Sequence, residues 1–144
     1  MLPHLMDEPR PYILLIDDDE DDLEMLSSSL NAIGVKTRSF VEAWKAIYYL
    51  HLLTATSDVP EFILLDFNMP GMNGSQVLEL LKKNKTTSAI PVVIYSTHLS
   101  PVFRNALLSL GAFDCLAKPS VFKDFTAQMK YFKDLALSFP SLNV

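Results

Sequence analysis

The chain contains one cysteine, Cys115, among its 144 residues. A single cysteine excludes an internal disulfide and a zinc site built from several thiolates. The residues around Cys115 are largely apolar, so we expect its thiol to be buried and chemically inert.

Long hydrophobic runs are also missing. No apolar stretch approaches the roughly 20 residues that a transmembrane helix needs. Residues 1–11 lack the charged start and apolar middle of a secretory signal peptide. We therefore expect a cytoplasmic protein with no membrane insertion.

An excess of positive charge is absent as well, since the net charge is -5. Seven of the 17 acids lie between Asp17 and Glu24, which leaves ten acids against twelve Lys and Arg in the rest of the chain. The acidity is therefore local. The cluster Lys82, Lys83 and Lys85 is interpreted as a solvated helix end, so no direct nucleic-acid binding is expected.

What the chain does have is enough apolar surface for one core. Its length is typical of one domain, 49% of its residues are hydrophobic and its mean hydropathy is +0.20. We expect an N-terminal extension over residues 1–10, one domain over residues 11–137 and a C-terminal tail over residues 138–144. No output domain is expected within these residues.

Five short aliphatic or β-branched runs predict β-strands. The runs alternate with segments of helical spacing, which indicates an α/β fold with a parallel sheet covered on both faces. The second run is the most polar and predicts an edge strand. The runs are Tyr12–Ile16, Val35–Phe40, Phe62–Leu65, Val92–Tyr95 and Cys115–Ala117.

The helical segments carry apolar residues at spacings that predict buried faces. Gly34 and Gly111 are expected to end two helices, and Ser100 with Pro101 to begin one. We interpret the stripes as core rather than as cofactor-binding motifs. They are Leu23, Leu26, Leu30 and Ile33; Trp44, Ile47 and Tyr48; Val77, Leu78 and Leu81; Phe103, Ala106, Leu107 and Leu110; and Phe122, Phe125, Met129 and Phe132.

Ionisable side chains follow several of these strands directly. Asp17 and Asp18 follow the first strand, Asp66 the third and Lys118 the fifth, while the hydroxyl of Ser96 follows the fourth. The carboxyl ends of parallel strands share one edge of a sheet, and open α/β sheets bind their ligands there. The pattern predicts a charged pocket for a metal and a phosphate.

Adjacent carboxylates repel each other unless a cation neutralises them. Hard oxygen ligands without a nearby His or Cys favour Mg²⁺, so Asp17 and Asp18 are interpreted as metal ligands. The acids from Asp19 to Asp22 are interpreted as the solvated start of a helix, where negative charge is favourable.

A carboxylate facing a phosphoryl group can act as a nucleophile and form an acyl phosphate, and Asp66 is placed for this role. Lys118 is placed to neutralise charge on the transferring oxygens, and Ser96 to donate its hydroxyl to one of them.

Together these residues resemble the receiver domain of two-component response regulators. The resemblance rests on Asp17-Asp18, on Asp66 within the segment 64–74, on Ser96 and on Lys118-Pro119, and it covers about Pro11 to Ala136.

The resemblance implies a flavodoxin-like three-layer sandwich with strand order 2-1-3-4-5 and five helices. It implies that Asp66 is the phosphoacceptor and that Mg²⁺, with Mn²⁺ as a possible substitute, is held by Asp18, Asp66 and the backbone carbonyl of Asn68, with Asp17 assisting. The implied phosphodonor is a sensor histidine kinase or a histidine phosphotransfer protein. The chain would then catalyse its own phosphoryl transfer and autodephosphorylation without turning over a separate substrate.

The resemblance also implies a switch. Phosphorylation draws Ser96 inward, pairs Lys118 with the phosphoryl oxygens and alters the face made by the fourth helix, fifth strand and fifth helix, where an unidentified downstream protein binds. The family often has an aromatic switch residue where this chain has Cys115, so ring rotation cannot report phosphorylation here. Thr97 and His98 follow Ser96 at the expected pocket mouth, and we hypothesise that His98 alters hydrolysis of the acyl phosphate.

Two alternatives remain. A haloacid-dehalogenase-type phosphatase needs a second acid at the position of Asn68, which argues against that class. A docking module that accepts no phosphate is the other alternative. Relay of phosphate, binding of a target and drainage of phosphate from a kinase all stay open, as does dimerisation.

Overall fold

The computed structural model describes residues 11–53 and 59–139. The expected N-terminal extension and most of the expected C-terminal tail lie outside the described residues. In the described part of the chain, no helix combines the length and the apolar character needed to cross a bilayer.

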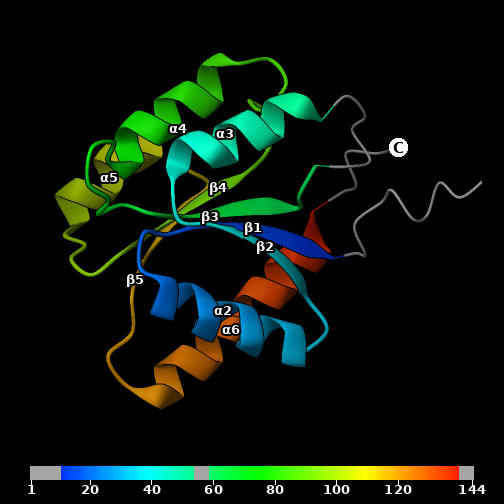
Figure 1. Ribbon diagram of the computed structural model, residues 1–144. Helices are drawn as coiled ribbons and strands as arrows, with labels where there is room; N and C mark the ends of the chain where they lie inside the picture. Colours follow the sequence, from blue (N-terminus) through cyan, green and yellow to red (C-terminus); the bar gives the residue numbers. More distant parts are fainter. Residues whose placement is uncertain (1–10, 54–58, 140–144) are drawn as a thin grey trace, which may run out of the picture.

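Strands and helices alternate along the chain and form three layers (Figure 1). All five strands pair in parallel, in the order β2-β1-β3-β4-β5, which confirms the predicted flavodoxin-like fold. The elements are β1 (Tyr12–Ile16), α2 (Glu20–Ala32), β2 (Lys36–Phe40), α3 (Ala43–Leu52), β3 (Phe62–Asp66), α4 (Gly74–Lys83), β4 (Val92–Ser96), α5 (Pro101–Ser109), β5 (Asp114–Ala117) and α6 (Phe122–Ser138).

The central strands are buried on both faces because helices cover the sheet from both sides. Side chains alternate along a strand, so Leu14 and Ile16 of β1 pack under α3, α4 and α5, while Ile13 and Leu15 pack under α2 and α6. The continuous apolar run of β1 therefore contributes to two hydrophobic cores, one on each face of the sheet.

The sheet ends at β2 on one side and at β5 on the other. No residue of β2 is fully buried, whereas every residue of β1, β3 and β4 is buried. This confirms the prediction that the most polar strand lies at an edge.

Local signals set several helix ends as predicted. The hydroxyl of Ser100 accepts the backbone N–H of Phe103 at the start of α5, with Pro101 in the first turn. Gly34 and Gly111 follow α2 and α5 with φ of 92° and 110°, a region that favours glycine.

The predicted buried face of α3 was wrong at Trp44 and Tyr48, which are 59% and 60% exposed. Ile47, the third predicted residue, is partly buried against the core, and the buried residues are Ala43, Ala46 and Leu50. Small alanine side chains occupy the face of α3 that packs on the sheet, and Trp44 and Tyr48 lie on its outer face.

Two other predicted stripes need correction at their ends. Phe122 is 82% exposed because it is the first residue of α6, before the helix reaches the sheet, whereas Phe125, Met129 and Phe132 are buried as predicted. In α5, Ala106 and Leu110 are exposed, and Leu107 is the buried residue of the predicted set.

The interpretation of the lysine cluster also fails at Lys82. Its ammonium donates to the backbone carbonyls of Ser88 and Ile90, at 3.2 and 2.9 Å, and burial lowers its pKa. Lys82 thus ties the end of α4 to the segment before β4 instead of being a purely solvated charge.

Cys115 lies in the sheet with 1% of its surface exposed, and burial raises the pKa of its thiol to about 11. The expectation of a buried thiol is confirmed, and a raised pKa disfavours the thiolate, which is the reactive form.

Candidate functional site

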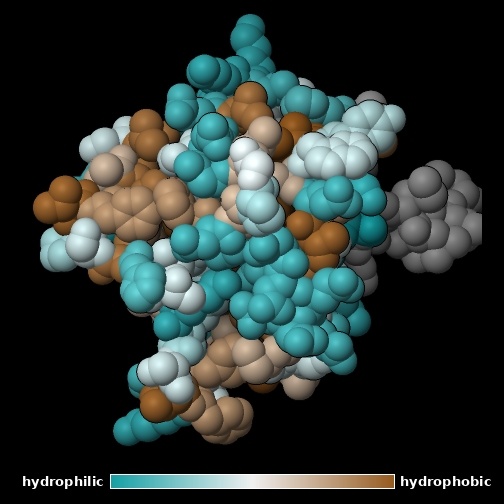
Figure 2. Space-filling view, turned by 60° about the vertical axis from the view of Figure 1, so that its left-hand side comes forward, coloured by the Kyte–Doolittle hydropathy of each residue, from teal (hydrophilic) through white to brown (hydrophobic). Residues whose placement is uncertain are grey.

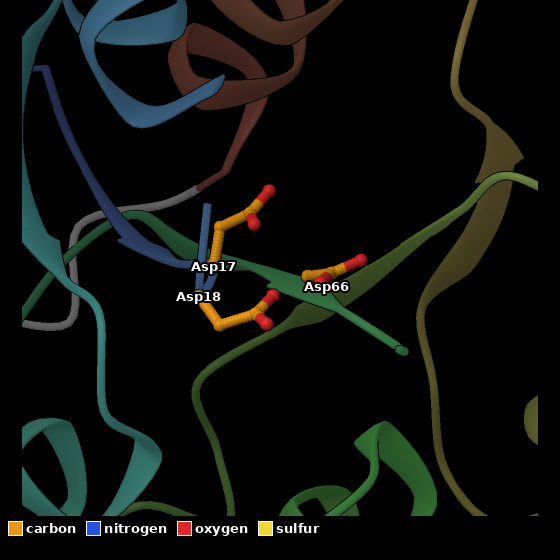
Figure 3. A group of neighbouring side chains, drawn as sticks. All are labelled: Asp17, Asp18 and Asp66. Atoms are coloured by element: carbon orange, nitrogen blue, oxygen red, sulfur yellow. The ribbon is translucent and has the colours of Figure 1, made fainter. Parts of the chain in front are cut away.

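The carboxyl edge of the sheet brings the predicted acids together. Asp17 and Asp18 follow β1, and Asp66 is the last residue of the neighbouring strand β3. Each can offer one oxygen, and these three oxygens lie within 4.8 Å of one another (Figure 3). The side chain of Asp17 points toward α2 and α6, while the carboxylate of Asp18 extends along the edge of the sheet toward Asp66.

The same edge receives Lys118 from the loop after β5. Its Nζ lies 3.0 Å from Asp17 Oδ2 and 3.2 Å from Asp66 Oδ1. Parallel pairing of Ser96 with Ala117, and a 2.8 Å hydrogen bond from the Lys118 backbone N–H to the Ser96 carbonyl, fix where this loop begins. The convergence of acids and lysine predicted from the strand ends is therefore observed.

The sequence did not predict one contact of Lys118. Asp22 Oδ2 lies 3.2 Å from Lys118 Nζ, so Asp22 belongs to the site rather than to a solvated helix start. Asp19 does cap α2, accepting the backbone N–H groups of Asp21 and Asp22. The available signal was helical phase: Asp22 lies one turn before the buried Leu26 and therefore on the face of α2 that packs on the sheet.

Burial and mutual repulsion perturb the acids. Burial raises the pKa of Asp66 to about 6, the charge of Asp17 adds to this, and Lys118 and the backbone N–H of Asn68 oppose it. Burial also raises the pKa of Asp17, against hydrogen bonds from the Asp19 backbone N–H and from Lys118. Burial alone would lower the pKa of Lys118, but hydrogen bonding and charge from Asp17 and Asp66 outweigh it and raise that pKa. Asp17 and Asp66 thus share the single ammonium of Lys118.

Ser96 is buried at the end of β4, and its hydroxyl is directed to the loops. It donates to the His98 carbonyl at 2.9 Å, lies 3.3 Å from Asn68 Oδ1, and accepts the His98 N–H at 3.3 Å. The Ser96 hydroxyl therefore binds to the backbone of the β4–α5 connection and to Asn68.

Thr97 and His98 are both exposed. Thr97 and Lys118 line the same pocket of about 220 Å³, and His98 contacts Ser96 through its backbone. Thr97 therefore lies at the rim of the site, and His98 is the next residue along the chain.

The loop after Asp66 is shaped by a close approach at Gly74. A Cβ on Gly74 would lie 2.8 Å from Phe67 Cα and 3.4 Å from the Asp66 carbonyl oxygen. Asn73 caps α4 in a capping box with Gln76, which fixes the helix start against this loop. Asn68, in the same loop, is exposed beside the acids.

A second polar connection runs from the sheet to α6. The Tyr95 hydroxyl donates to Gln128 Oε1, and Gln128 Nε2 donates to the Ala117 carbonyl at 2.9 Å. Lys118 Nζ lies 5.8 Å from the centre of the Tyr95 ring. The residues around Lys118 are thereby joined to the last helix.

The surface above this edge is polar. Figure 2 turns this side of the molecule forward and shows a hydrophilic band across its middle, flanked by hydrophobic side chains. A buried carboxylate, an adjacent ammonium and a set of hard oxygen ligands open to a polar surface form a site suited to an anionic group bound together with a divalent cation.

A doubly wound parallel sheet with acids after β1 and β3 and a lysine after β5 is the architecture of a receiver module. Residues 13–130 match the family model described as the response regulator receiver domain, and the chain belongs to this family.

The chain is 34% identical over 120 residues to the transcriptional regulatory protein PrrA of Mycobacterium tuberculosis, an alignment covering 83% of this chain and 48% of PrrA. It is 32% identical over 126 residues to the chemotaxis protein CheV1 of Helicobacter pylori, covering 86% of this chain and 38% of CheV1. The chain thus spans about half the length of PrrA and less of CheV1.

Solved structures show the same fold. The Mn²⁺-bound form of response regulator Rcp1 has a TM-score of 0.76 at 25% identity, covering 90% of this chain and 99% of Rcp1. The phosphorylated cyanobacterial phytochrome response regulator RcpA has a TM-score of 0.77 at 23% identity, covering 90% and 96%. As a receiver domain, the chain is a module of phosphorylation-based signalling rather than a metabolic enzyme.

Proposed function

We propose that Asp66 accepts a phosphoryl group from a phosphohistidine of a sensor histidine kinase or a histidine phosphotransfer protein. The observation that carries the proposal is the position of Asp66: a buried carboxylate 3.2 Å from the Lys118 ammonium, with Asp17 and Asp18 beside it. A carboxylate oxygen can attack phosphorus as a nucleophile, and the adjacent ammonium of Lys118 balances the negative charge that the phosphoryl group brings.

In the proposed step, an oxygen of Asp66 forms a bond to phosphorus while the P–N bond of the phosphohistidine breaks. The electron pair of that bond goes to the imidazole nitrogen. Lys118 balances negative charge on the phosphoryl oxygens, and Ser96 donates its hydroxyl to one of them after leaving the His98 carbonyl. Hydrolysis of the acyl phosphate at the same site returns Asp66, which is the proposed autodephosphorylation.

The donor set fits a divalent cation, since it consists of carboxylate oxygens in a group small enough for one ion. We assign Asp17, Asp18, Asp66 and the backbone carbonyl of Asn68 to this site, with Mg²⁺ as the ion and Mn²⁺ as a substitute. The Mn²⁺-bound form of Rcp1 supports this assignment. When bound, the cation supplies charge neutralisation for the incoming phosphate.

We assign residues 11–137 to the receiver unit and place the partner-binding surface on the face of α5, β5 and α6. Asp114 joins these elements, because its carboxylate accepts hydrogen bonds from Arg104 at 2.6 Å and Tyr131 at 2.7 Å. The face also carries exposed apolar side chains that a partner can cover. They are Val102, Leu110, Phe113, Val121 and Phe122.

The test is an incubation with Mg²⁺ and a small phosphodonor such as phosphoramidate, read by intact mass. We expect wild type to gain one phosphoryl group and Asp66→Asn to gain none. Asp134→Asn, an identical change at an exposed position on α6, is the matched control and should behave as wild type. A wild-type chain that gains no mass would favour the docking module that accepts no phosphate.

A further inference from the structure

Asp22 is a fourth carboxylate at the site, and it differs from the other three. Its side chain is 35% exposed and lies 3.2 Å from Lys118 Nζ. It is not a member of the group of oxygens that could hold a cation, which consists of Asp17, Asp18 and Asp66. Asp22 therefore contacts the ammonium of the site from outside the metal cluster.

The arrangement creates a conflict of charges. Lys118 contacts Asp17 and Asp66, and the same two carboxylates are needed by the cation. An ammonium and a dication that share ligands repel each other, so cation binding weakens the hold of these acids on Lys118.

Asp22 can still bind the Lys118 ammonium when the cation occupies the other acids. It extends from the first turn of α2, and Figure 3 shows Asp17 directed toward this layer. With Asp17, Lys118 and Tyr95, Asp22 lines the pocket of about 220 Å³ that also contains Thr97.

We propose that Asp22 is a positioning residue whose carboxylate keeps the Lys118 ammonium beside Asp66 while a divalent cation occupies the neighbouring acids. This inference rests on the proposed function. Asp22 acts through Lys118 and touches neither the cation nor the phosphoryl group.

The chain offers a matched control. Asp21 lies in the same first helical turn and carries the same charge, but its side chain is exposed and makes no contact with Lys118 among the described residues. Asp21→Asn and Asp22→Asn remove equal charge from adjacent residues of one helical turn, so a difference between them reports contact rather than net charge.

The first measurement is Mg²⁺ affinity, from the rise in melting temperature with Mg²⁺ concentration, in a double-mutant cycle of Asp22→Asn with Lys118→Ala. We expect Asp22→Asn to weaken Mg²⁺ binding by roughly two- to fivefold, the size expected of one partly exposed ion pair. Asp21→Asn should have a smaller effect. With Lys118→Ala in place, Asp22→Asn should have no larger effect than Asp21→Asn.

The second measurement is the rate of phosphorylation by phosphoramidate at saturating Mg²⁺, followed by intact mass. Asp22→Asn should slow the reaction by a similar two- to fivefold factor, and Asp22→Glu, which keeps the charge, should restore part of the rate. Circular dichroism confirms that each variant is folded.

Equal effects of Asp21→Asn and Asp22→Asn would overturn the inference, as would an Asp22→Asn effect on Mg²⁺ affinity that persists without Lys118. The lack of any Mg²⁺-dependent stabilisation of wild type would also overturn it. A wild-type protein that binds Mg²⁺ but takes up no phosphoryl group would contradict the proposed function alone, since the affinity cycle still tests the role of Asp22.

Discussion

Asp17 and Asp66 lie side by side at the ends of β1 and β3, and only 3% and 4% of their surfaces are exposed. Burial and the charge of Asp17 raise the pKa of Asp66 to about 6. Without a bound cation, the negative charge of Asp66 is therefore less favourable in the folded protein than in the unfolded chain.

Asp66→Asn should stabilise the cation-free protein at about pH 8 by roughly 1 to 3 kcal/mol, because the variant carries no charge at position 66. The folded pKa of Asp66 is raised, so its contribution to stability is present below its ordinary value of 3.8 and is lost as the pH rises through about 6. Thermal unfolding in EDTA should thus show a large difference between variant and wild type at about pH 8 and a small one at about pH 4. A difference that does not change with pH would contradict this reading of the site.

Divalent cations should stabilise wild type more strongly above pH 6 than below it. Protons and cations compete for the same carboxylates, and burial raises the pKa of both Asp17 and Asp66. At a Mg²⁺ concentration 100 times Kd, we expect about 2.7 kcal/mol of stabilisation. Trp44 and Asp18 line one pocket, so tryptophan fluorescence offers a second measurement. Asp18→Asn should weaken the effect, and an undiminished response in that variant would remove Asp18 from the site.

Gly74→Ala should lower stability by about 1 to 3 kcal/mol and also slow phosphorylation of Asp66. The new Cβ would lie 2.8 Å from Phe67 Cα, so the loop that follows Asp66 must shift. Gly71→Ala is the control: its φ of 83° makes alanine unfavourable, by about 1 kcal/mol, but no atom lies within 4 Å of the new Cβ. It should lose stability while phosphorylating at the wild-type rate. Equal phosphorylation rates for both variants would show that the loop position does not control the site.

His98→Ala should change the lifetime of the phosphorylated protein. His98 is exposed beside Thr97, which lies at the rim, and its backbone holds the Ser96 hydroxyl, so its side chain is placed to orient or obstruct the attacking water. The measurement is decay of the phosphoryl mass after removal of the donor. Thr97→Ala is a neighbouring variant at the same rim, and equal lifetimes for His98→Ala and wild type would leave His98 without a role.

The fold was predictable because the strands are short, apolar and separated by clear turn residues. The position of the acids was equally predictable, because a charged residue directly after a buried parallel strand lies at the carboxyl edge of the sheet. Asp22 was missed because it is one of several consecutive acids, and composition does not show which of them turns toward Lys118. Its role depends on helical phase and on a contact between distant parts of the chain.

The error in α3 has a physical cause. Trp44 and Tyr48 carry a strong hydrophobic signal, yet they are exposed, while Ala43 and Ala46 are buried. The distance between helix and sheet decides which residue size fits, and this distance is a property of the whole fold. Sequence periodicity alone does not contain it.

The two outermost strands have a consequence for assembly. Lys36 and Arg38 place positive charge along β2, and β5 is only four residues long. Charged and short margins disfavour the addition of a further strand from another molecule, and so protect the sheet from edge-to-edge aggregation. Association with another protein should therefore proceed through helices and loops, with the backbone ladder left intact.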